Sequence, residues 1–374
     1  MQNIHITSQF LPHRGELERA SSLPSQGEQE GARVLMVGSA EQSGGGVASV
    51  IRLMKRMPFW KERRCGWLGT QIQASYATKL WYALRAYVVA LFTIWRYGIV
   101  HFHTVPDKIC LVIQLPVLLL AKLARKKVIL HIHMGNQLED HTNNRLFLWC
   151  LRRADRIVLL VRKWQNLFAV LYPSVKVPTT VIYNACETDV TVDYSRKEKL
   201  IIMAAHLDEN KRPDLLLKAW SHLRNEFPDW RVIIMGNGDV PHYEQLANEL
   251  GLQDTVRFTG YITGREKEDI WERASIYAMC SRHEGFPMVV LEAWTRGVAV
   301  VTTPVGGLPD VMEEGYNCLS FPFGDEEGLT RQLRCLMGDA QLCQSIATYA
   351  KQETVGQFSP ERVNEDIERM YNNL

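Results

Sequence analysis

The sequence lacks the spacings that hold a metal ion or a disulfide framework. Its eight cysteines are scattered over 374 residues without a CxxC pair, and no cysteine and histidine cluster occurs along the chain. Zinc sites and disulfide-rich folds rely on such spacings. We therefore expect free thiols, as in a reducing cytoplasmic setting, and no metal site.

Long apolar runs are missing as well. The two longest, 81–95 and 109–121, are interrupted by polar residues or proline, and neither reaches the roughly 18 uninterrupted apolar residues of a membrane span. Residues 1–31 contain no apolar stretch of the kind found in a secretion signal and are rich in Ser, Gln, Glu and Gly. We interpret them as a flexible N-terminal leader.

Several nucleotide-binding motifs are absent. Neither half of the chain has a GxGxxG turn followed by an acidic residue about twenty positions later, which disfavours an NAD-dependent oxidoreductase. No GK[ST] follows a glycine-rich loop, so there is no Walker-type phosphate loop. The pair Asp-x-Asp, which often holds a divalent metal, occurs nowhere.

The net charge of +2 hides an uneven distribution. Between residues 42 and 138 there are fourteen basic residues and only two acidic ones, Glu62 and Asp107, with aromatic residues interleaved. This combination is typical of surfaces that contact anionic lipid headgroups. An apolar core with an ordinary solvated face gives a similar pattern, and a nucleic-acid surface would also be basic. We favour a membrane surface and no nucleic-acid partner, because no DNA- or RNA-binding signature is present.

Short β-branched runs alternate with longer helical patterns from Arg33 onward, which predicts βαβ units around parallel sheets. A polar stretch, 187–199, separates two such series. We predict two doubly wound α/β domains, 32–190 and 191–355, and a final helix in 356–374 that can cross back onto the first domain. The predicted strands are 34–38, 99–103, 128–131, 156–161 and 179–183, then 200–205, 232–235, 256–259, 276–279, 299–302 and 318–321.

Ligands of open α/β sheets bind beyond the carboxyl ends of the strands, where helix N-termini offer backbone donors. One such loop holds Gly44, Gly45 and Gly46 directly before a predicted helix. Glycines there let the backbone approach an anion such as a diphosphate, although a plain tight turn has the same composition.

Two further loops carry polar side chains at strand ends. HIHMGN places His133 at a sheet edge, where it can hydrogen-bond a sugar hydroxyl, while His131 lies on the strand and is interpreted as structural. The loop after residue 205 begins with His206 and carries Lys211 shortly before Pro213, which suits the first turn of a helix. A lysine there can neutralise a phosphate, although exposed lysines are usually only solvated.

The most informative segment is HEGFPMVVLE, at 283–292. Glu284 precedes a turn into a helix and Glu292 lies eight residues farther along, so the two carboxylates can hold two separated hydroxyl-bearing rings of one extended ligand. The backbone N–H groups of the first helical turn remain available for phosphate oxygens between those rings. A nucleoside diphosphate sugar has this order of parts.

With these motifs the chain resembles glycosyltransferase family 4 from about residue 33 to its end. The resemblance rests on HEGFPMVVLE, TPVGGLPD (303–310), MGNG (235–238), IYN (182–184) and ADRIV (154–158). It implies the GT-B fold, in which two Rossmann-like doubly wound domains face each other across a cleft.

The resemblance also implies roles for individual residues. Glu284 contacts donor-sugar hydroxyls, Glu292 the ribose, and Lys211 the diphosphate; His133 lines the donor sugar, and His206 stands where the family has a second phosphate-binding cation, an arginine. His133, Glu284 and Lys211 are thus the implied catalytic residues. The implied donor-binding residues are Gly45, Gly46, His206, Lys211, Gly236, Asn237, Gly285, Phe286, Met288, Val289 and Glu292.

The implied reaction is retaining transfer of a hexose-type sugar from a UDP- or GDP-linked donor to an acceptor hydroxyl. The acceptor is expected to be a lipid-linked or other saccharide in the synthesis of a surface polysaccharide or glycolipid, at the inner face of the cell membrane. No cofactor and no metal are expected. The alternatives are a non-catalytic subunit that binds sugar nucleotides, which the histidine at position 206 keeps open, and a hydrolase or phosphorolytic enzyme on the same fold.

Overall fold

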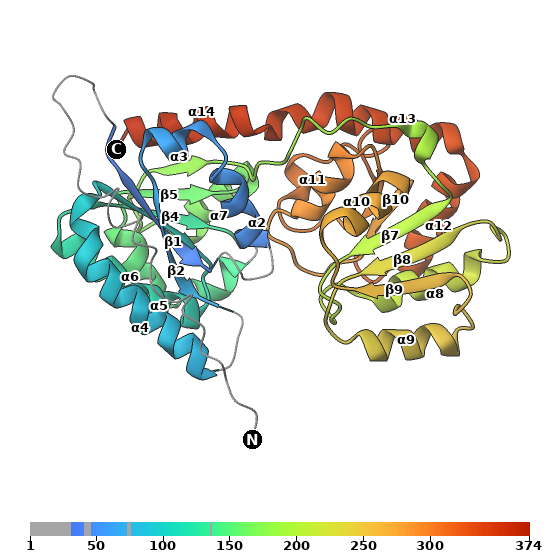
Figure 1. Cartoon of the computed structure of the whole chain (residues 1–374), viewed down its shortest axis with the longest axis horizontal. Coiled ribbons are helices and arrows are strands. Elements are labelled where there is room, and N and C mark those ends of the chain that lie inside the picture. Colours follow the sequence, from blue (N-terminus) through green and yellow to red (C-terminus); the bar gives the residue numbers. More distant parts are fainter. Residues whose placement is uncertain (1–30, 41–45, 73–75, 135–136) are drawn as a thin grey trace. The chain divides into compact units, whose positions relative to one another are not determined.

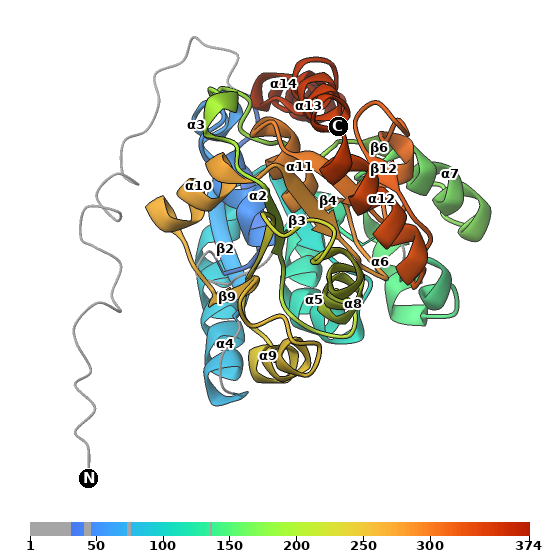
Figure 2. The same cartoon turned by 90° about the vertical axis from the view of Figure 1, so that its right-hand side faces the viewer.

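The computed structural model describes residues 31–40, 46–72, 76–134 and 137–374. The predicted leader, apart from Gly31, lies outside the described residues, as do Gly44, Gly45 and Asn136. The described part contains two six-stranded sheets in which every pair of neighbouring strands is parallel (Figures 1 and 2).

The first sheet has the strand order β2-β1-β3-β4-β5-β6. Its strands are β1 (Val34–Ser39), β2 (Gly66–Gln71), β3 (Ile99–Thr104), β4 (Lys127–Ile132), β5 (Arg156–Leu159) and β6 (Thr179–Val181). Its helices are α2 (Gly46–Met54), α3 (Pro58–Glu62), α4 (Tyr76–Thr93), α5 (Lys108–Leu123), α6 (Arg145–Arg153) and α7 (Arg162–Leu171).

The second sheet has the order β12-β11-β10-β7-β8-β9, the order of a doubly wound dinucleotide-binding fold. Its strands are β7 (Leu200–Ala204), β8 (Arg231–Met235), β9 (Val256–Gly260), β10 (Ile276–Met279), β11 (Ala299–Thr302) and β12 (Leu319–Ser320). The later helices are α8 (Pro213–Leu223), α9 (Val240–Glu249), α10 (Gly264–Arg273), α11 (Met288–Thr295), α12 (Glu326–Gly338), α13 (Ala340–Tyr349) and α14 (Pro360–Asn372).

The two faces of the first sheet are sealed by different helices. Because successive side chains of a strand point to opposite faces, Leu35 and Val37 join an apolar cluster with α4, α5 and α6. Val34 and Met36 join a second cluster with α2, α3 and α14. Both faces are buried, which is why the strands read as nearly continuous apolar runs.

The last described helix, α14, belongs to the core of the first domain. Its buried residues Val363, Ile367 and Tyr371 share a cluster with β1 and α3. The backbone N–H of Phe59 on α3 donates to Asn364 Oδ1 at 2.9 Å. Figure 1 shows α14 in red beside α3 in blue.

The predicted α/β class with two doubly wound domains is confirmed, and all eleven predicted strands are present. One strand, β2, was not predicted. It is an edge strand that pairs only with β1, and its sequence, GWLGTQ, contains two glycines, which are uncommon in strands. Among the described residues, no helix has the length and hydrophobicity needed to cross a membrane.

Candidate donor site

The strand order of the second sheet reverses between β7 and β10, and the loops that follow these two strands meet. Lys211, from the loop after β7, forms an ion pair with Glu284, from the loop after β10. Ser281 donates its hydroxyl to the same carboxylate oxygen of Glu284 at 2.6 Å. In doubly wound sheets this reversal is where ligands bind, and here it holds a cation, a carboxylate and a hydroxyl in contact.

Backbone contacts tie the two loops together. The Asn210 side chain donates to the carbonyl oxygen of His283 and accepts from the His283 N–H, both at 3.0 Å. The Arg282 N–H donates to the Asn210 carbonyl at 2.7 Å. Asp208 accepts from the Lys211 N–H at 2.9 Å, which closes the first loop on itself. The position of Lys211 against Glu284 is therefore set by main-chain geometry, not only by its flexible side chain.

Glu292 lies on α11, eight residues after Glu284, and has cationic partners of its own. Lys267, from α10, forms an ion pair with Glu292 at 2.5 Å, and Arg296 lies one turn farther along α11 at 4.0 Å from the same oxygen. A quarter of the Glu292 side chain is exposed. The two glutamates thus sit in separate polar surroundings.

His206 and Asn237 meet at the neighbouring strand ends. His206 Nδ1 lies 2.9 Å from Asn237 Oδ1, and both side chains are exposed. The loop carrying Asn237 follows β8 and lies directly against the loop after β7, since a Cβ on Gly236 would stand 1.7 Å from the Ala205 carbonyl oxygen. Gly236 also has a φ of +145°, a conformation that side chains disfavour.

The loop at Gly285 also touches the first domain. A Cβ on Gly285 would lie 2.4 Å from the carbonyl oxygen of His133, so only glycine fits there. The side chain of Asn184 donates to the Phe286 carbonyl at 3.2 Å, and the Phe286 ring packs against Tyr183. His133 is therefore brought next to the residue that follows Glu284.

The helix that follows this loop, α11, begins at Met288. Its N-cap position is occupied by Pro287, which makes no side-chain cap. The first-turn N–H groups of a helix have no partner within the helix itself. Phe286 is buried, while Met288 and Val289 are partly exposed. Gly46, the described part of the other predicted glycine loop, begins α2 and is exposed.

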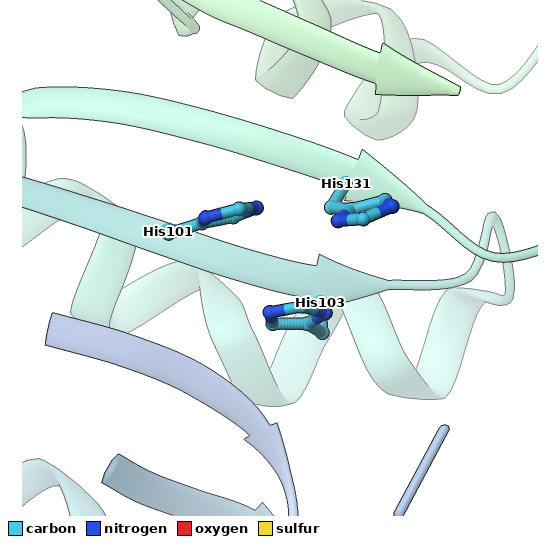
Figure 3. Close-up of side chains that lie close together, drawn as sticks. All are labelled: His101, His103 and His131. Atoms are coloured by element: carbon cyan, nitrogen blue, oxygen red, sulfur yellow. The ribbon is translucent and has the colours of Figure 1, made fainter. Parts of the chain in front are cut away.

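Four histidines form a buried row on the face of the first sheet that packs against α14. His101 and His103 lie on β3, His131 on β4, and His133 directly after β4, and none is more than 4% exposed. Neighbouring rings lie with their centroids 4.5 to 5.4 Å apart and their planes 15° to 34° from parallel, and Figure 3 shows three of them, His101, His103 and His131. His103 Nδ1 is 2.9 Å from His133 Nε2, and His101 Nδ1 is 2.8 Å from the Tyr371 hydroxyl.

Burial keeps these rings neutral. It lowers the pKa of His133 to about 4. Burial and the neighbouring His133 lower the pKa of His101 to about 3, and the pKa values of His103 and His131 also fall well below 6.5. Ring nitrogens of His101, His103 and His131 lie within 4.8 Å of one another. An imidazole binds a metal ion through a ring nitrogen, in the plane of the ring, and the planes of these three rings lie 15° to 34° from parallel.

Most of the predicted residues for which contacts are seen fall into three groups. Lys211 contacts Glu284, His206 contacts Asn237, and Gly285 abuts His133. Sequence reasoning missed the partners that hold them, namely Ser281, Lys267, Asn210 and His103. The two HxH patterns, at 101–103 and 131–133, were the available signal for the histidine row, because strand periodicity places both pairs on one face.

The chain is similar in sequence and fold to several known proteins. Residues 192–353 match the family "Glycosyl transferases group 1". A D-inositol 3-phosphate glycosyltransferase of Corynebacterium urealyticum is 32% identical over 47% of this chain and 43% of its own length. A GalNAc-alpha-(1->4)-GalNAc-alpha-(1->3)-diNAcBac-PP-undecaprenol alpha-1,4-N-acetyl-D-galactosaminyltransferase of Campylobacter jejuni is 27% identical over 46% of this chain and 48% of its own length. The chain thus spans less than half the length of these relatives.

A solved structure extends the likeness to the first domain. HepE from Anabaena, in complex with UDP-glucose, superposes with a TM-score of 0.74 at 17% sequence identity. The superposition covers 92% of this chain and 100% of the HepE chain. That likeness shows the two-domain fold, and the match over 192–353 agrees with the family that the sequence resembles. This part of the chain is therefore similar to the group 1 glycosyltransferases.

Proposed function

We propose that this chain transfers a hexose-type sugar from a UDP- or GDP-linked donor to an acceptor hydroxyl, with retention of anomeric configuration. The observation that carries the proposal is the contact of Lys211, Glu284 and Ser281 at the reversal point of the second sheet. In the reaction an acceptor oxygen bonds to the anomeric carbon while the bond to the diphosphate breaks. The acceptor proton leaves with the phosphate oxygen, and no enzyme nucleophile is assigned.

When the donor binds, Glu284 and Lys211 would contact different parts of it. The carboxylate of Glu284 accepts hydrogen bonds from sugar hydroxyls, and the Lys211 ammonium stabilises the charge that develops on the leaving diphosphate. The uncapped first turn of α11 offers further N–H donors to the phosphate oxygens. This division of labour needs no metal, and we propose metal-independent chemistry.

Glu292 would bind the ribose. It lies on α11, eight residues after Glu284, so the two carboxylates can reach different parts of one extended ligand, and Lys267 forms an ion pair with the Glu292 carboxylate. Two acceptor oxygens on one carboxylate can receive both ribose hydroxyls. Support for a UDP-linked donor comes from HepE, whose structure contains UDP-glucose.

The second candidate function is a non-catalytic subunit that binds sugar nucleotides. The observation that favours it is His206, which stands in place of the family arginine and is hydrogen-bonded to Asn237. An imidazole with one nitrogen engaged by an amide has at most one nitrogen left for a phosphate, whereas an arginine offers five N–H donors. The donor would then bind with less charge stabilisation at its leaving group.

We further propose that the acceptor is lipid-linked and that α4 and α5 place the enzyme on the cytoplasmic face of a membrane. One face of α4 exposes large apolar side chains at helical spacing, and α5 exposes more. The exposed residues are Leu80, Trp81, Leu84, Val88, Leu91, Phe92, Trp95, Ile109, Val112, Leu119 and Leu123; we call this set the α4–α5 face. Tyr87 on α4 donates its hydroxyl to the Ile113 carbonyl on α5 at 2.9 Å, which holds the two helices side by side.

Charge argues for lipid as the occupant of the α4–α5 face. Between residues 63 and 138 the only acidic residue is Asp107, while Lys79, Arg85, Arg96 and Arg125 are exposed on or beside the two helices. An apolar stripe flanked by several cations, with a single carboxylate at the first end of α5, suits a bilayer interface with anionic headgroups. The relative from Campylobacter jejuni is named for an undecaprenol-linked acceptor, which supports the same choice.

A thermal-shift screen tests the donor proposal. UDP, GDP, ADP and their sugar conjugates are added to the wild-type chain and to Glu292→Gln. A ligand at a hundredfold excess over its Kd stabilises the native state by about 2.7 kcal/mol. We expect a shift with one nucleotide series in the wild type that is lost in Glu292→Gln. Glu327→Gln, at a fully solvated glutamate of α12, is the matched control and should keep the shift.

Turnover then separates the two candidate functions. Release of free UDP or GDP from the sugar conjugate that gives the shift, in the presence of a lipid-linked acceptor, indicates the transferase. A clear shift without any product would favour the binding subunit. The absence of a shift with every nucleotide would contradict both.

A further inference from the structure

The row of four histidines is unusual for its place in the fold. Strands of a parallel sheet covered on both faces normally carry Val, Ile or Leu at such positions. On this face, Ile99 of β3 is followed by His101 and His103, and Ile129 of β4 is followed by His131 and His133. Polar groups buried in place of apolar ones cost stability unless they are partnered, which suggests that the row has a use.

Counting protons assigns a direction to the contact between His103 and His133. A neutral imidazole has one N–H and one acceptor nitrogen. If His133 Nε2 were the donor, His103 would carry its proton on Nε2, which is buried and has no hydrogen-bond partner among the described residues. A buried N–H without an acceptor is rarer and costlier than an acceptor without a donor. His103 Nδ1–H therefore donates to His133 Nε2.

That direction decides what His133 can offer to a ligand. With Nε2 accepting from His103, the neutral His133 ring carries its proton on Nδ1. No residue in the described ranges hydrogen-bonds His133 Nδ1, and that atom is not among the fully buried ones. The carbonyl oxygen of His133 meanwhile abuts Gly285, one residue from Glu284.

We propose that His103 is a positioning residue for the transfer reaction, which fixes His133 in the tautomer that presents Nδ1–H to an oxygen of the donor. This rests on the proposed function and on the role that the family resemblance implies for His133, which is to line the donor sugar. An uncharged N–H can bind a sugar oxygen or a developing phosphate charge without the desolvation cost of a cation. Without the hydrogen bond from His103, the His133 ring would populate two tautomers. Only one of them carries a proton on Nδ1.

The scaffold around His103 is built to hold it. Gln114, buried on α5, donates to the His103 carbonyl at 3.0 Å, and the His133 N–H donates to the Thr104 carbonyl at 2.9 Å. These hydrogen bonds fix the ends of β3 and β4 relative to each other. The positions of the His103 and His133 rings are therefore fixed as well. The His131 ring lies against the rings of both His103 and His133.

Two substitutions separate positioning from packing. His103→Asn keeps an N–H donor where Nδ1 stands, whereas His103→Leu fills the space without a donor. With UDP-glucose as the donor probe, or the conjugate selected by the thermal-shift screen, we expect His103→Leu to lower kcat by about tenfold or more, as for other residues that orient a functional imidazole. His103→Asn should restore most of that loss. Equal losses in both variants would overturn the proposal.

Two further measurements remain decisive if a variant folds poorly. Nitrogen-15 NMR of the wild-type imidazoles should show His133 protonated on Nδ1, and protonation on Nε2 would overturn the proposal whatever the reaction is. In a double-mutant cycle, His103→Leu should cost nothing further in a His133→Ala background. A full activity of His133→Ala would instead contradict the role of His133 in the proposed function and leave the NMR result standing.

The cluster also allows a direct check for an ion. Elemental analysis of the purified chain is expected to show no transition metal in stoichiometric amount. One equivalent of metal that is lost in both His103→Leu and His131→Val would overturn the positioning role, because the row would then be a metal site.

Discussion

At the scale of single residues, spacing suggested a chemistry but did not indicate the contacts. The pattern from Glu284 to Glu292 predicts two hydroxyl-binding carboxylates, and their roles stay a prediction. Nothing in the sequence indicated that Lys211 would meet Glu284, 73 residues away, because that contact depends on β7 and β10 being neighbours. Ser281 carries no motif at all. The histidine row depends in the same way on the parallel register of β3 and β4.

The buried histidines predict a loss of stability in mild acid. In the folded state the pKa of His133 is lowered to about 4 and that of His101 to about 3, so these rings stay neutral where an unfolded chain is protonated. As pH falls from 6.5 towards 4 the unfolded state gains protons that the folded state does not, and the free energy of unfolding decreases. Each such histidine contributes a slope of about 1.4 kcal/mol per pH unit.

Urea unfolding at pH 7.5 and at pH 5 measures this effect. His131→Val replaces one buried imidazole with a residue that parallel strands favour. It should remove the contribution of one histidine from the pH dependence of the free energy of unfolding. His242→Val, at an exposed histidine of α9, is the control and should leave the dependence nearly unchanged. An unaltered slope in His131→Val would show that His131 is protonated equally in both states.

At the scale of elements, hydrophobic periodicity predicted every strand whose residues are apolar, and failed at β2. The two glycines of β2 allow neighbouring residues to pack closely against the strand. A Cβ on Gly66 would collide with the Tyr97 hydroxyl, and a Cβ on Gly69 would lie 3.2 Å from Ala40. The same periodicity predicted α4 as a helix but could not say which side of it is covered. For this basic and aromatic region the sequence favoured a membrane surface over an apolar core with a solvated face.

Binding to vesicles tests the α4–α5 face. Because its centre is apolar and its surroundings are basic, we expect binding to anionic vesicles that weakens but persists in high salt. The double variant Leu84→Glu with Phe92→Glu should lower vesicle binding at least tenfold, since two carboxylates would enter the interface. Val170→Glu places the same charge on an equally exposed apolar residue of α7 and should bind as the wild type. Equal binding to neutral and anionic vesicles by every form would contradict the proposal.

At the scale of the whole molecule, the sequence indicated two domains, but it left open where the last helix belongs. α14 is joined to the first domain by a buried cluster and by the ion pair of Arg63 with Glu368. Desolvation opposes the charge on Arg63, but the hydrogen bond to Glu368 is stronger and raises the pKa of its guanidinium. The pairing could not be read from the sequence because more than 300 residues separate the partners.

Two alanine substitutions of equal chemistry should show this division. Ile367, on α14, and Leu333, on α12, are both fully buried, and each truncation is expected to cost about 2–5 kcal/mol. In hydrogen exchange, Ile367→Ala should speed exchange in β1 and β3, and Leu333→Ala in the second sheet. Faster exchange confined to the second sheet in Ile367→Ala would contradict the assignment of α14 to the first domain.

The position of α14 has a consequence for how the chain is made. A ribosome delivers β1 to β6 first, yet Val363, Ile367 and Tyr371, which cover one face of that sheet, emerge only after the second sheet has been synthesised. The nascent first domain can bring α2 and α3 against Val34 and Met36, but α14 joins the same cluster only later, whereas α12 and α13 directly follow their own sheet. The face of the sheet that is begun first is therefore completed only after the second sheet has been made.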